Sequence, residues 1–271
     1  MQPVSAPPSN INQPSGREFE IKSFGLTDIG REREVNEDAM LVDNLHSLYL
    51  VFDGMGGHTA GQLASQLAME SLAATFVDSE ATHPQVEPLV RGIENANEAI
   101  FVHAQANPET RGMGTTAVGV RFNEDQLHIC HVGDSRLYRL RGPGLQRLTR
   151  DHSLANLYAD KPELEGQMGP STSNVIVRAL GLDFNVEVEH RVVAVEEDDL
   201  FLLCCDGLTD LVSDKDIARI MQSELPLADM AAALVDTANH NGGTDNITVI
   251  LMLAYDGDGE FFTDGKTALG F

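Results

Sequence analysis

The segment Tyr49–Gly61, YLVFDGMGGHTAG, joins a run of apolar residues to a loop rich in glycine. The run predicts a buried strand that ends at Asp53, and the apolar spacing after the loop predicts a helix over about 60–77. A carboxylate at the end of a core strand requires an explanation, because burying a charge without a partner is costly. One explanation is a hairpin turn, which an Asp-Gly pair favours, and the other is a bound cation.

The composition limits the classes of function. The 271 residues carry a formal net charge of -24, and 42% of them are hydrophobic, which is sufficient for one large domain or two small ones. An acidic surface repels phosphate backbones and anionic lipids, which argues against nucleic-acid and membrane-surface binding. Cys130, Cys204 and Cys205 lie in apolar runs without a CxxC spacing. This pattern indicates buried thiols in a reducing compartment, and neither a disulfide framework nor a zinc site.

The ends of the chain differ from its middle. Residues 1–17 are rich in Pro, Ser and Asn and lack a signal region, so we expect a disordered leader before a domain over 18–256. The Gly-rich acidic segment 257–271 is expected to be a solvated tail, since it lacks the closing glutamate of an EF-hand calcium loop. No apolar run reaches the ~20 residues that a membrane-spanning helix needs, and we expect a cytoplasmic protein.

Periodicity predicts an α+β protein with many short strands and a few helices. The expected helices cover 60–77, 84–106, a segment that begins at Ser213 with Asp216 at the capping-box position, and 227–240. Expected strands cover 19–24, 38–44, 47–54, 115–122, 126–132, 136–141, 174–180, 185–195, 199–207 and 245–255. Residues 152–173 are expected to form a long loop. The order of the elements favours a four-layer αββα sandwich, in which two antiparallel sheets stack face to face beneath outer helices.

Asp53, Asp206 and Asp245 share one arrangement. Each lies at the edge of an apolar run, beside glycine or a small residue. If the fold brings these strand ends together, mutual repulsion and desolvation require a cation among them. The candidate ligands are hard oxygens without a His/Cys cluster, which favours Mg²⁺ or Mn²⁺. Hairpin turns remain the alternative, although the first two Asp-Gly pairs precede expected helices.

Further candidates accompany these aspartates. Asp134 lies in a Gly-Asp pair at another strand end, and the segment REREVNEDAM contains Arg33, Glu37 and Asp38. An arginine near two acids is consistent with a surface ion pair, which stabilises little. The planar guanidinium is also suited to bidentate binding of a phosphate dianion.

Eight motifs together resemble one family. REREVNED, VFDGMGGH, RGMGTTAV, VGDSRLYR, RDHSL, VIVRALG, LCCDGLTD and GGTDNITVI stand in the order and spacing of the metal-dependent Ser/Thr protein phosphatases (PPM, or type 2C). The resemblance runs from about residue 19 to 255 and is closest to the bacterial branch. It implies a central β-sandwich flanked by helix pairs, with the metal centre at one edge.

The resemblance also implies roles for the acidic residues. Asp53 would bridge two ions and act as a catalytic residue together with Asp38, and the carbonyl of Gly54 would be a further ligand. Glu37 and Asp38 would hold metal-bound waters. The remaining implied ligands are Asp206 and Asp245 at one ion, and Asp134, Asp206 and Asp210 at a third, weaker site.

For the substrate, the resemblance implies that Arg33 grips the phosphate and that Asn246 lies close to it. Residues 152–173 would form the variable flap beside the active site. Animal members carry a histidine directly after the first Asp-Gly, where this chain has Met55. The general acid therefore stays open between His58 and a metal-bound water, and His58 could equally be a residue that starts a helix.

The expected reaction is hydrolysis of phosphoserine or phosphothreonine in proteins by a water activated between two Mn²⁺ or Mg²⁺ ions. Partners would be phosphoproteins made by a Ser/Thr kinase, and the chain is expected to be a monomer. The alternative is a non-catalytic regulator on the same fold that binds phosphoproteins. Loss of a metal aspartate would indicate that alternative, and none is missing.

Overall fold

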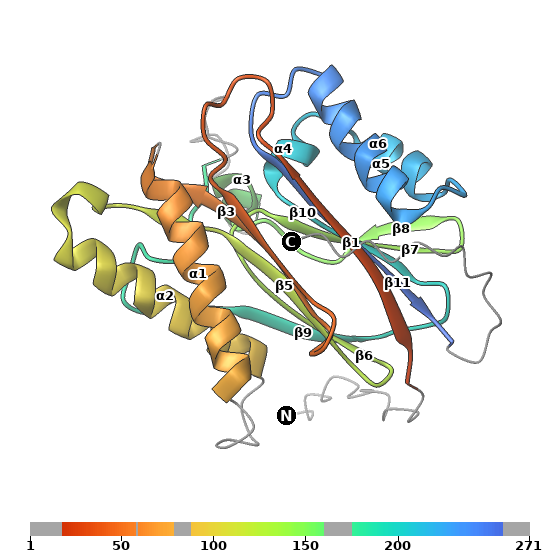
Figure 1. The fold of residues 1–271 in the computed structure, drawn as a ribbon, viewed down its shortest axis with the longest axis horizontal. Helices are drawn as coiled ribbons and strands as arrows, with labels where there is room; N and C mark the ends of the chain where they lie inside the picture. Colours follow the sequence, from red (N-terminus) through yellow and green to blue (C-terminus); the bar gives the residue numbers. More distant parts are fainter. Residues whose placement is uncertain (1–17, 58, 79–87, 160–174, 257–271) are drawn as a thin grey trace, which may run out of the picture.

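The computed structural model describes residues 18–57, 59–78, 88–159 and 175–256 (Figure 1). Within them, two antiparallel sheets stack face to face, and helices cover the outer face of each sheet. This is the four-layer αββα sandwich that the order of the elements predicts. No helix among the described residues is long and apolar enough to cross a membrane.

One sheet contains the first and last strands of the domain. Its order is β1 (Glu20–Asp28), β11 (Ile247–Tyr255), β10 (Leu200–Cys204), β7 (Arg136–Arg141) and β8 (Gly144–Arg147). β11 is buried along nearly its whole length, as expected for a strand that has neighbours on both sides and layers above and below.

The other sheet contains the segment quoted at the start. Its order is β2 (Asp38–Asp43), β3 (Leu48–Met55), β5 (Ala117–Asn123), β6 (Gln126–Val132) and β9 (Glu189–Ala194). The two-residue strand β4 (Gly114–Thr115) pairs with the end of β3. Asp53 therefore lies in a strand that is paired on both sides, and its position is fixed by the ladder.

The long helices follow the predicted ranges. α1 (Thr59–Asp78) and α2 (Pro88–Ala106) pack together over the sheet of β3, while α5 (Asp214–Met221) and α6 (Leu227–His240) lie by the sheet of β11. At α5, the Ser213 hydroxyl accepts from the Asp216 amide and donates to its carboxylate, which confirms the predicted N-terminal cap. Short helices occupy Pro108–Thr110 (η2), Leu154–Ala159 (α3) and Asp206–Thr209 (α4).

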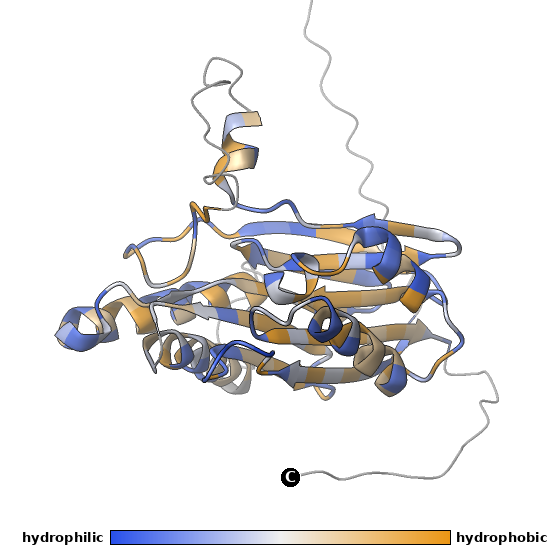
Figure 2. Cartoon of the chain, turned by 90° about the horizontal axis from the view of Figure 1, so that it is seen from above, coloured by the Kyte–Doolittle hydropathy of each residue, from blue (hydrophilic) through white to orange (hydrophobic). Residues whose placement is uncertain are grey.

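Three apolar clusters separate the four layers. One lies between the first helix pair and its sheet, one between the two sheets, and one between the other sheet and α5 with α6. Seen from above, the strands carry hydrophobic residues through the interior of the sandwich (Figure 2). The central cluster includes Tyr49, Val51 and Phe201, all completely buried. These side chains place the ends of β3 and β10 in one common core.

Several predicted elements were wrong. Residues 175–180 form only isolated bridges, because Ile176 pairs with Ser153 and Leu180 with Thr115 outside both sheets. The strand predicted at 185–195 is confined to β9, while α3 lies in the segment predicted to be a loop. β8 was not predicted, since four residues with one half-buried side chain leave no periodic pattern. The leader at 1–17, the tail at 257–271 and most of the predicted flap, 160–173, lie outside the described residues.

Candidate metal centre

The structure brings the predicted aspartates together at one edge of the sandwich. Asp38 begins β2 and stands directly opposite Asp53 of β3 in the ladder. Asp206 is the first residue of α4 and follows β10, and Asp245 precedes β11 by one residue. Both sheets therefore contribute carboxylates, and side-chain ligand atoms of Asp38, Asp53 and Cys205 all lie within 4.8 Å of one another.

Tight backbone packing explains the glycines that follow two of these aspartates. A Cβ on Gly54 would collide with the carbonyl oxygens of Gly61 and Glu37, and a Cβ on Gly207 would collide with the carbonyl of Asn246. Only glycine allows such an approach. Each of these two glycines is therefore required by close packing against a neighbouring backbone. This requirement is independent of any role of the Gly54 carbonyl as a metal ligand.

Burial, together with neighbouring negative charge, raises the pKa of the carboxylates in this centre. Burial, followed by the charges of Asp206 and Asp38, raises the pKa of Asp53 well above its usual value. Burial also raises the pKa of Asp38 to about 7, although a hydrogen bond of 2.6 Å from the Thr248 hydroxyl to Oδ2 of Asp38 opposes the shift. Burial likewise raises the pKa of Asp206 to about 6. Without a cation, this edge of the protein is strained by its own negative charge.

The residues present fit a hard divalent cation. Among the described residues, no Lys or Arg forms an ion pair with Asp38, Asp53, Asp134 or Asp206. Oδ1 of Asp134 is buried without a hydrogen-bond partner in the described part of the chain. Apart from the Cys205 thiol, the converging donors are oxygen atoms, as Mg²⁺ and Mn²⁺ prefer. Cys205 already donates to the Asn246 carbonyl and accepts from the Thr248 amide.

Arg33 lies at the mouth of this centre. Its Nη2 is 2.7 Å from Oδ2 of Asp245, and its Nη1 is 3.5 Å from Oε2 of Glu37. The side chain is 44% exposed and borders a cavity of about 350 Å³ that Val35 and Gly57 also line. Arg33 is therefore paired with the carboxylates of the centre itself and remains open to a ligand that enters the cavity.

Asn246 supports this mouth from beneath. Its side chain is 3% exposed, and its Nδ2 donates to the carbonyls of Ile29 and Val35 at 2.9 and 3.1 Å. Its Oδ1 accepts from the Glu37 amide at 2.8 Å. Both amide hydrogens are thus used by the loop that carries Arg33 and Glu37. These bonds show that Asn246 holds the loop, and its closeness to a bound phosphate stays a prediction.

The residues predicted for a third site line an acidic cavity of about 200 Å³. Asp134, Asp206 and Asp210 line it together with Arg136 and Arg147. Burial, followed by the charges of Asp206 and Asp151, raises the pKa of Asp134 to about 7.

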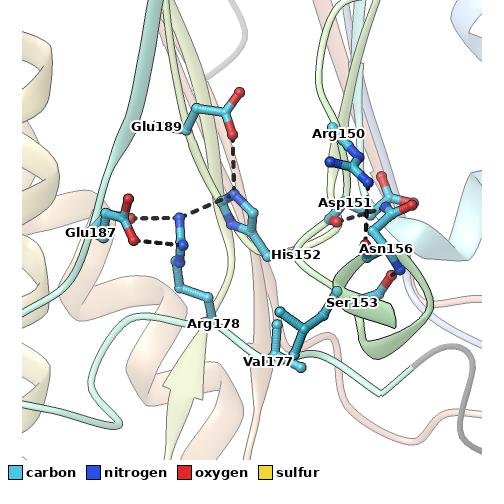
Figure 3. A pocket seen from close by; sticks show the side chains of 10 residues that line it. Arg150, Asp151, His152, Ser153, Asn156, Val177, Arg178, Glu187 and Glu189 are labelled. Atoms are coloured by element: carbon cyan, nitrogen blue, oxygen red, sulfur yellow. Dashed lines mark hydrogen bonds and ion pairs between the residues drawn. The ribbon is translucent and has the colours of Figure 1, made fainter. Parts of the chain in front are cut away.

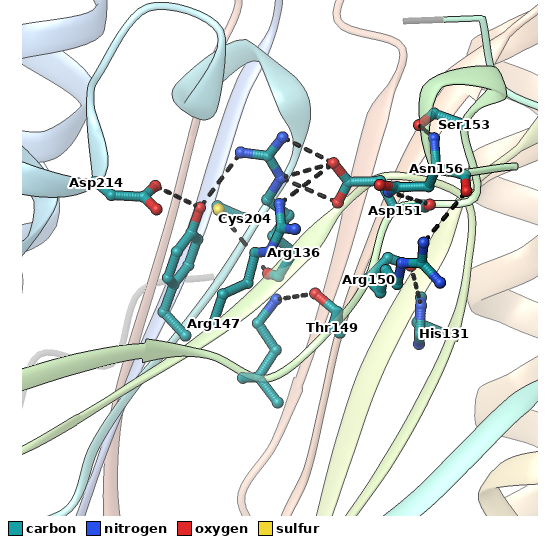
Figure 4. Close-up of polar contacts among 12 residues, drawn as sticks. His131, Arg136, Arg147, Thr149, Arg150, Asp151, Ser153, Asn156, Cys204 and Asp214 are labelled. Atoms are coloured by element: carbon teal, nitrogen blue, oxygen red, sulfur yellow. Dashed lines mark hydrogen bonds and ion pairs between the residues drawn. The ribbon is translucent and has the colours of Figure 1, made fainter. Parts of the chain in front are cut away.

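The two arginines of that cavity are already committed to Asp151 (Figure 4). Arg136 donates to its two carboxylate oxygens at 3.1 and 2.8 Å, and Arg147 approaches Oδ2 at 3.4 Å. Asp134 and Asp210 have no ion pair within the described residues, so the cavity keeps an excess of negative charge.

A second cluster contains His131, His152 and Glu189, whose ligand atoms lie within 4.8 Å of one another. Figure 3 shows His152 and Glu189. The Nδ1 atom of His152 accepts from the Gly133 amide at 3.0 Å, and its Nε2 lies 3.4 Å from Oε2 of Glu189 and 3.3 Å from Nη1 of Arg178. A metal ion would therefore meet an amide hydrogen at Nδ1 and the positive charge of Arg178 at Nε2. Burial lowers the pKa of His152 to about 4, so the neutral ring is kept. This cluster therefore holds the loop before α3 and is unsuited to a metal ion.

The sequence prediction missed the hydroxyl residues Thr115, Thr116 and Ser135. They lie inside the RGMGTTAV and VGDSRLYR motifs and bond to the backbone around Asp53 or to each other. Only the motif membership pointed to them. His58, the candidate general acid, lies outside the described residues.

Comparison with known proteins identifies the family. A family model described as protein phosphatase 2C matches residues 30–252. The chain belongs to this family. The serine/threonine phosphatase stp of Listeria monocytogenes is 38% identical over 235 residues, which are 83% of this chain and 93% of the relative.

Solved structures of this family confirm the predicted fold. The catalytic domain of the serine threonine protein phosphatase PstP, in complex with two manganese ions, has a TM-score of 0.77 at 33% identity. That match covers 88% of this chain and 100% of PstP. Serine/threonine phosphatase Stp1 from Staphylococcus aureus has a TM-score of 0.78 at 31% identity, covering 89% of this chain and 98% of Stp1.

The raised pKa values predict an unusual pH dependence of stability. In the folded protein the pKa is about 7 for Asp38 and Asp134 and about 6 for Asp206. These values are above the pKa of ~3.9 of an aspartate in an unfolded chain. The metal-free folded state therefore binds more protons than the unfolded state, and its free energy of unfolding falls as pH rises from about 4 to about 7. In EDTA, we expect the Tm to fall across this window.

Mn²⁺ should reverse that trend. A ligand that binds only the folded state adds ~2.7 kcal/mol at a hundredfold excess over its Kd. Thermal melts at a series of pH values, with EDTA or with Mn²⁺, measure both effects. Two results would contradict the raised pKa values and the metal site. One is a Tm in EDTA that stays constant or rises between pH 4 and 7, and the other is a Tm that does not change with Mn²⁺.

Proposed function

We propose that this chain is a metal-dependent protein serine/threonine phosphatase that hydrolyses phosphoserine and phosphothreonine with Mn²⁺ or Mg²⁺. The observation that carries the proposal is the convergence of Asp38, Asp53 and Asp206 from both sheets, with Arg33 beside them at the mouth of a cavity. Family membership and the named phosphatases among the relatives support the same activity.

The proposed ligands follow the geometry. Asp53, the Gly54 carbonyl, Asp206 and Asp245 would hold the tight ions. Glu37 and Asp38 would complete their surroundings. When bound, two such ions lower the pKa of a water and neutralise the charge that develops on the phosphoryl oxygens. Their presence in PstP supports this assignment.

The remaining steps belong to the chain's own residues. Arg33 would bind the substrate phosphate bidentately after exchanging its contact with Asp245 for the ligand. Thr248 donates to one carboxylate oxygen of Asp38 and would orient this side chain to accept a proton from the attacking water. Burial raises the pKa of this carboxyl to about 7 in the metal-free protein, which supports a role in holding a proton near neutral pH.

The proposal extends to the setting of the enzyme. We propose a phosphatase domain over 18–256 whose substrates are phosphoproteins made by a Ser/Thr kinase, acting as a monomer in the cytoplasm. All three cysteines are buried and none forms a disulfide, which fits a reducing compartment. The segment 152–173 is proposed as the flap, and its described part, with α3, borders the third-site cavity through Ser153 and Asn156.

Asp53→Asn tests the metal centre directly. Asparagine keeps the shape of the side chain but removes the charge that two ions would share, so we expect a near-total loss of turnover of a phosphothreonine peptide. Phosphate release and bound Mn²⁺ are measured on the same sample. Asp236→Asn on the exposed side of α6 is the matched control and should keep full activity. Wild-type-like turnover by Asp53→Asn would refute the assignment.

Arg33→Ala distinguishes a phosphate ligand from an ordinary surface ion pair. If Arg33 binds the phosphate, the KM for a phosphopeptide should rise, with a smaller fall in kcat. The control is Arg219→Ala, which removes an exposed pair with Asp216 of 3.3 Å. Equal and small effects of the two substitutions would return Arg33 to the surface ion-pair interpretation.

Asp134→Asn tests the third site. A cation held by Asp134 and Asp210 would be bound weakly and with several waters, so its occupancy depends on metal concentration. We expect this variant to keep two tightly bound Mn²⁺ ions and to lose much of its kcat at saturating Mn²⁺. If titration with Mn²⁺ gave the wild-type activity curve, Asp134 would be only a turn residue.

A further inference from the structure

The backbone of Asp53 is fixed by two adjacent threonines. The Thr116 amide and the Thr115 hydroxyl both donate to the Asp53 carbonyl, at 2.9 and 2.8 Å. The Asp53 amide in turn donates to Oγ1 of Thr116 at 3.1 Å. Thr116 therefore binds both polar groups of the Asp53 main chain, one through its own main chain and one through its side chain.

The same Thr116 hydroxyl reaches the turn that carries Asp134. Its Oγ1 lies 2.7 Å from Oγ of Ser135, and the two residues are 1% and 2% exposed. Gly133 packs against Thr116 from the other side of the turn, where a Cβ would lie 2.7 Å from the Cβ and Cγ2 atoms of Thr116. Gly133 has a φ of +108°, which also favours glycine. The turn of Asp134 is thus seated on the Thr116 side chain.

These contacts form one continuous path between two predicted metal ligands. The path runs from the Asp53 amide through Oγ1 of Thr116 to Oγ of Ser135, the residue after Asp134. Burial keeps water from replacing either hydroxyl.

We propose that Thr116 and Ser135 are positioning residues that set the separation between Asp53 and Asp134, and thereby couple the tight metal centre to the third cation site. The inference rests on the proposed function, because it assigns those aspartates to metal ions. Removal of a residue that orients a metal ligand commonly costs about 10–100-fold in affinity or activity. Thr116 contacts the backbone of Asp53, and Ser135 follows Asp134 in the chain, so they act through Asp53 and Asp134 and not on the substrate.

The test uses Thr116→Val, Ser135→Ala and the double variant in the full chain. Valine is close in shape to threonine and lacks the hydroxyl, so the substitution removes the hydrogen bonds without opening a cavity. Calorimetric titration with Mn²⁺ measures each binding step. We expect either single substitution to weaken the weaker Mn²⁺ step about tenfold. The double variant should lose little more than one single variant, since either substitution breaks the same path.

Steady-state kinetics separates positioning from general destabilisation. With a phosphothreonine peptide as substrate, Thr116→Val and Ser135→Ala should have a lower kcat at fixed Mn²⁺ and an unchanged KM. A higher Mn²⁺ concentration should restore part of the kcat. Thr237→Val is the matched control, since it removes a hydroxyl that donates to the Ala233 carbonyl within α6. It should leave Mn²⁺ binding and kcat as in the wild type.

Four outcomes would overturn the inference. The first is wild-type Mn²⁺ affinity in both Thr116→Val and Ser135→Ala, and the second is a double variant in which the two losses of Mn²⁺ affinity simply add. The third is a lowered Tm with unchanged Mn²⁺ binding. The fourth is a loss of Mn²⁺ affinity and kcat in Thr237→Val equal to that in Thr116→Val. If the wild type binds Mn²⁺ and hydrolyses the peptide, only the positioning role fails. A wild-type chain that binds no Mn²⁺ would overturn this inference and the proposed function together.

Discussion

Repulsion among buried carboxylates is the constraint on which this structure depends. Asp38, Asp53 and Asp206 are held close together by strands of two different sheets, and burial raises the pKa of each of them. The apolar core between the sheets keeps them there, since Tyr49 and Val51, a few residues before Asp53, and Phe201, before Asp206, are completely buried. A divalent cation among these carboxylates would replace their mutual repulsion by attraction to the ion, so the site is suited to bind one.

The surroundings of the centre are built from backbone contacts as much as from side chains. Gly54 and Gly207 allow neighbouring chains to approach within distances that any Cβ would block. Asn246 ties the loop of Arg33 and Glu37 to β11 through three hydrogen bonds. Such contacts fix the ligands before any ion arrives, which lowers the cost of organising the site on binding.

The arginines near the centre differ in whether they are available to a ligand. Arg136 and Arg147 lie close to the third-site aspartates, but both donate to Asp151, and the charge of Arg136 only partly opposes the raised pKa of Asp210. Arg33 is the exception, because its pairs with Asp245 and Glu37 are partly open to solvent. A negatively charged substrate therefore meets an accessible guanidinium at the mouth, while the interior remains negative enough to hold cations.

The sequence by itself determined the class of the fold, the long helices and most strands, because these depend on local periodicity and on capping such as that of Ser213. It also singled out the aspartates, because each stands where an apolar run meets glycine or a small residue. Tertiary structure alone decided that residues 175–180 form bridges in place of a strand, since their partners Ser153 and Thr115 are distant in sequence. It decided as well that Asn246 bonds to the backbone of the Arg33 loop and that Thr116 joins the strand of Asp53 to the turn of Asp134. A hydroxyl or an amide looks the same in sequence whether it faces a ligand or a neighbouring chain, and only packing between distant segments selects its partner.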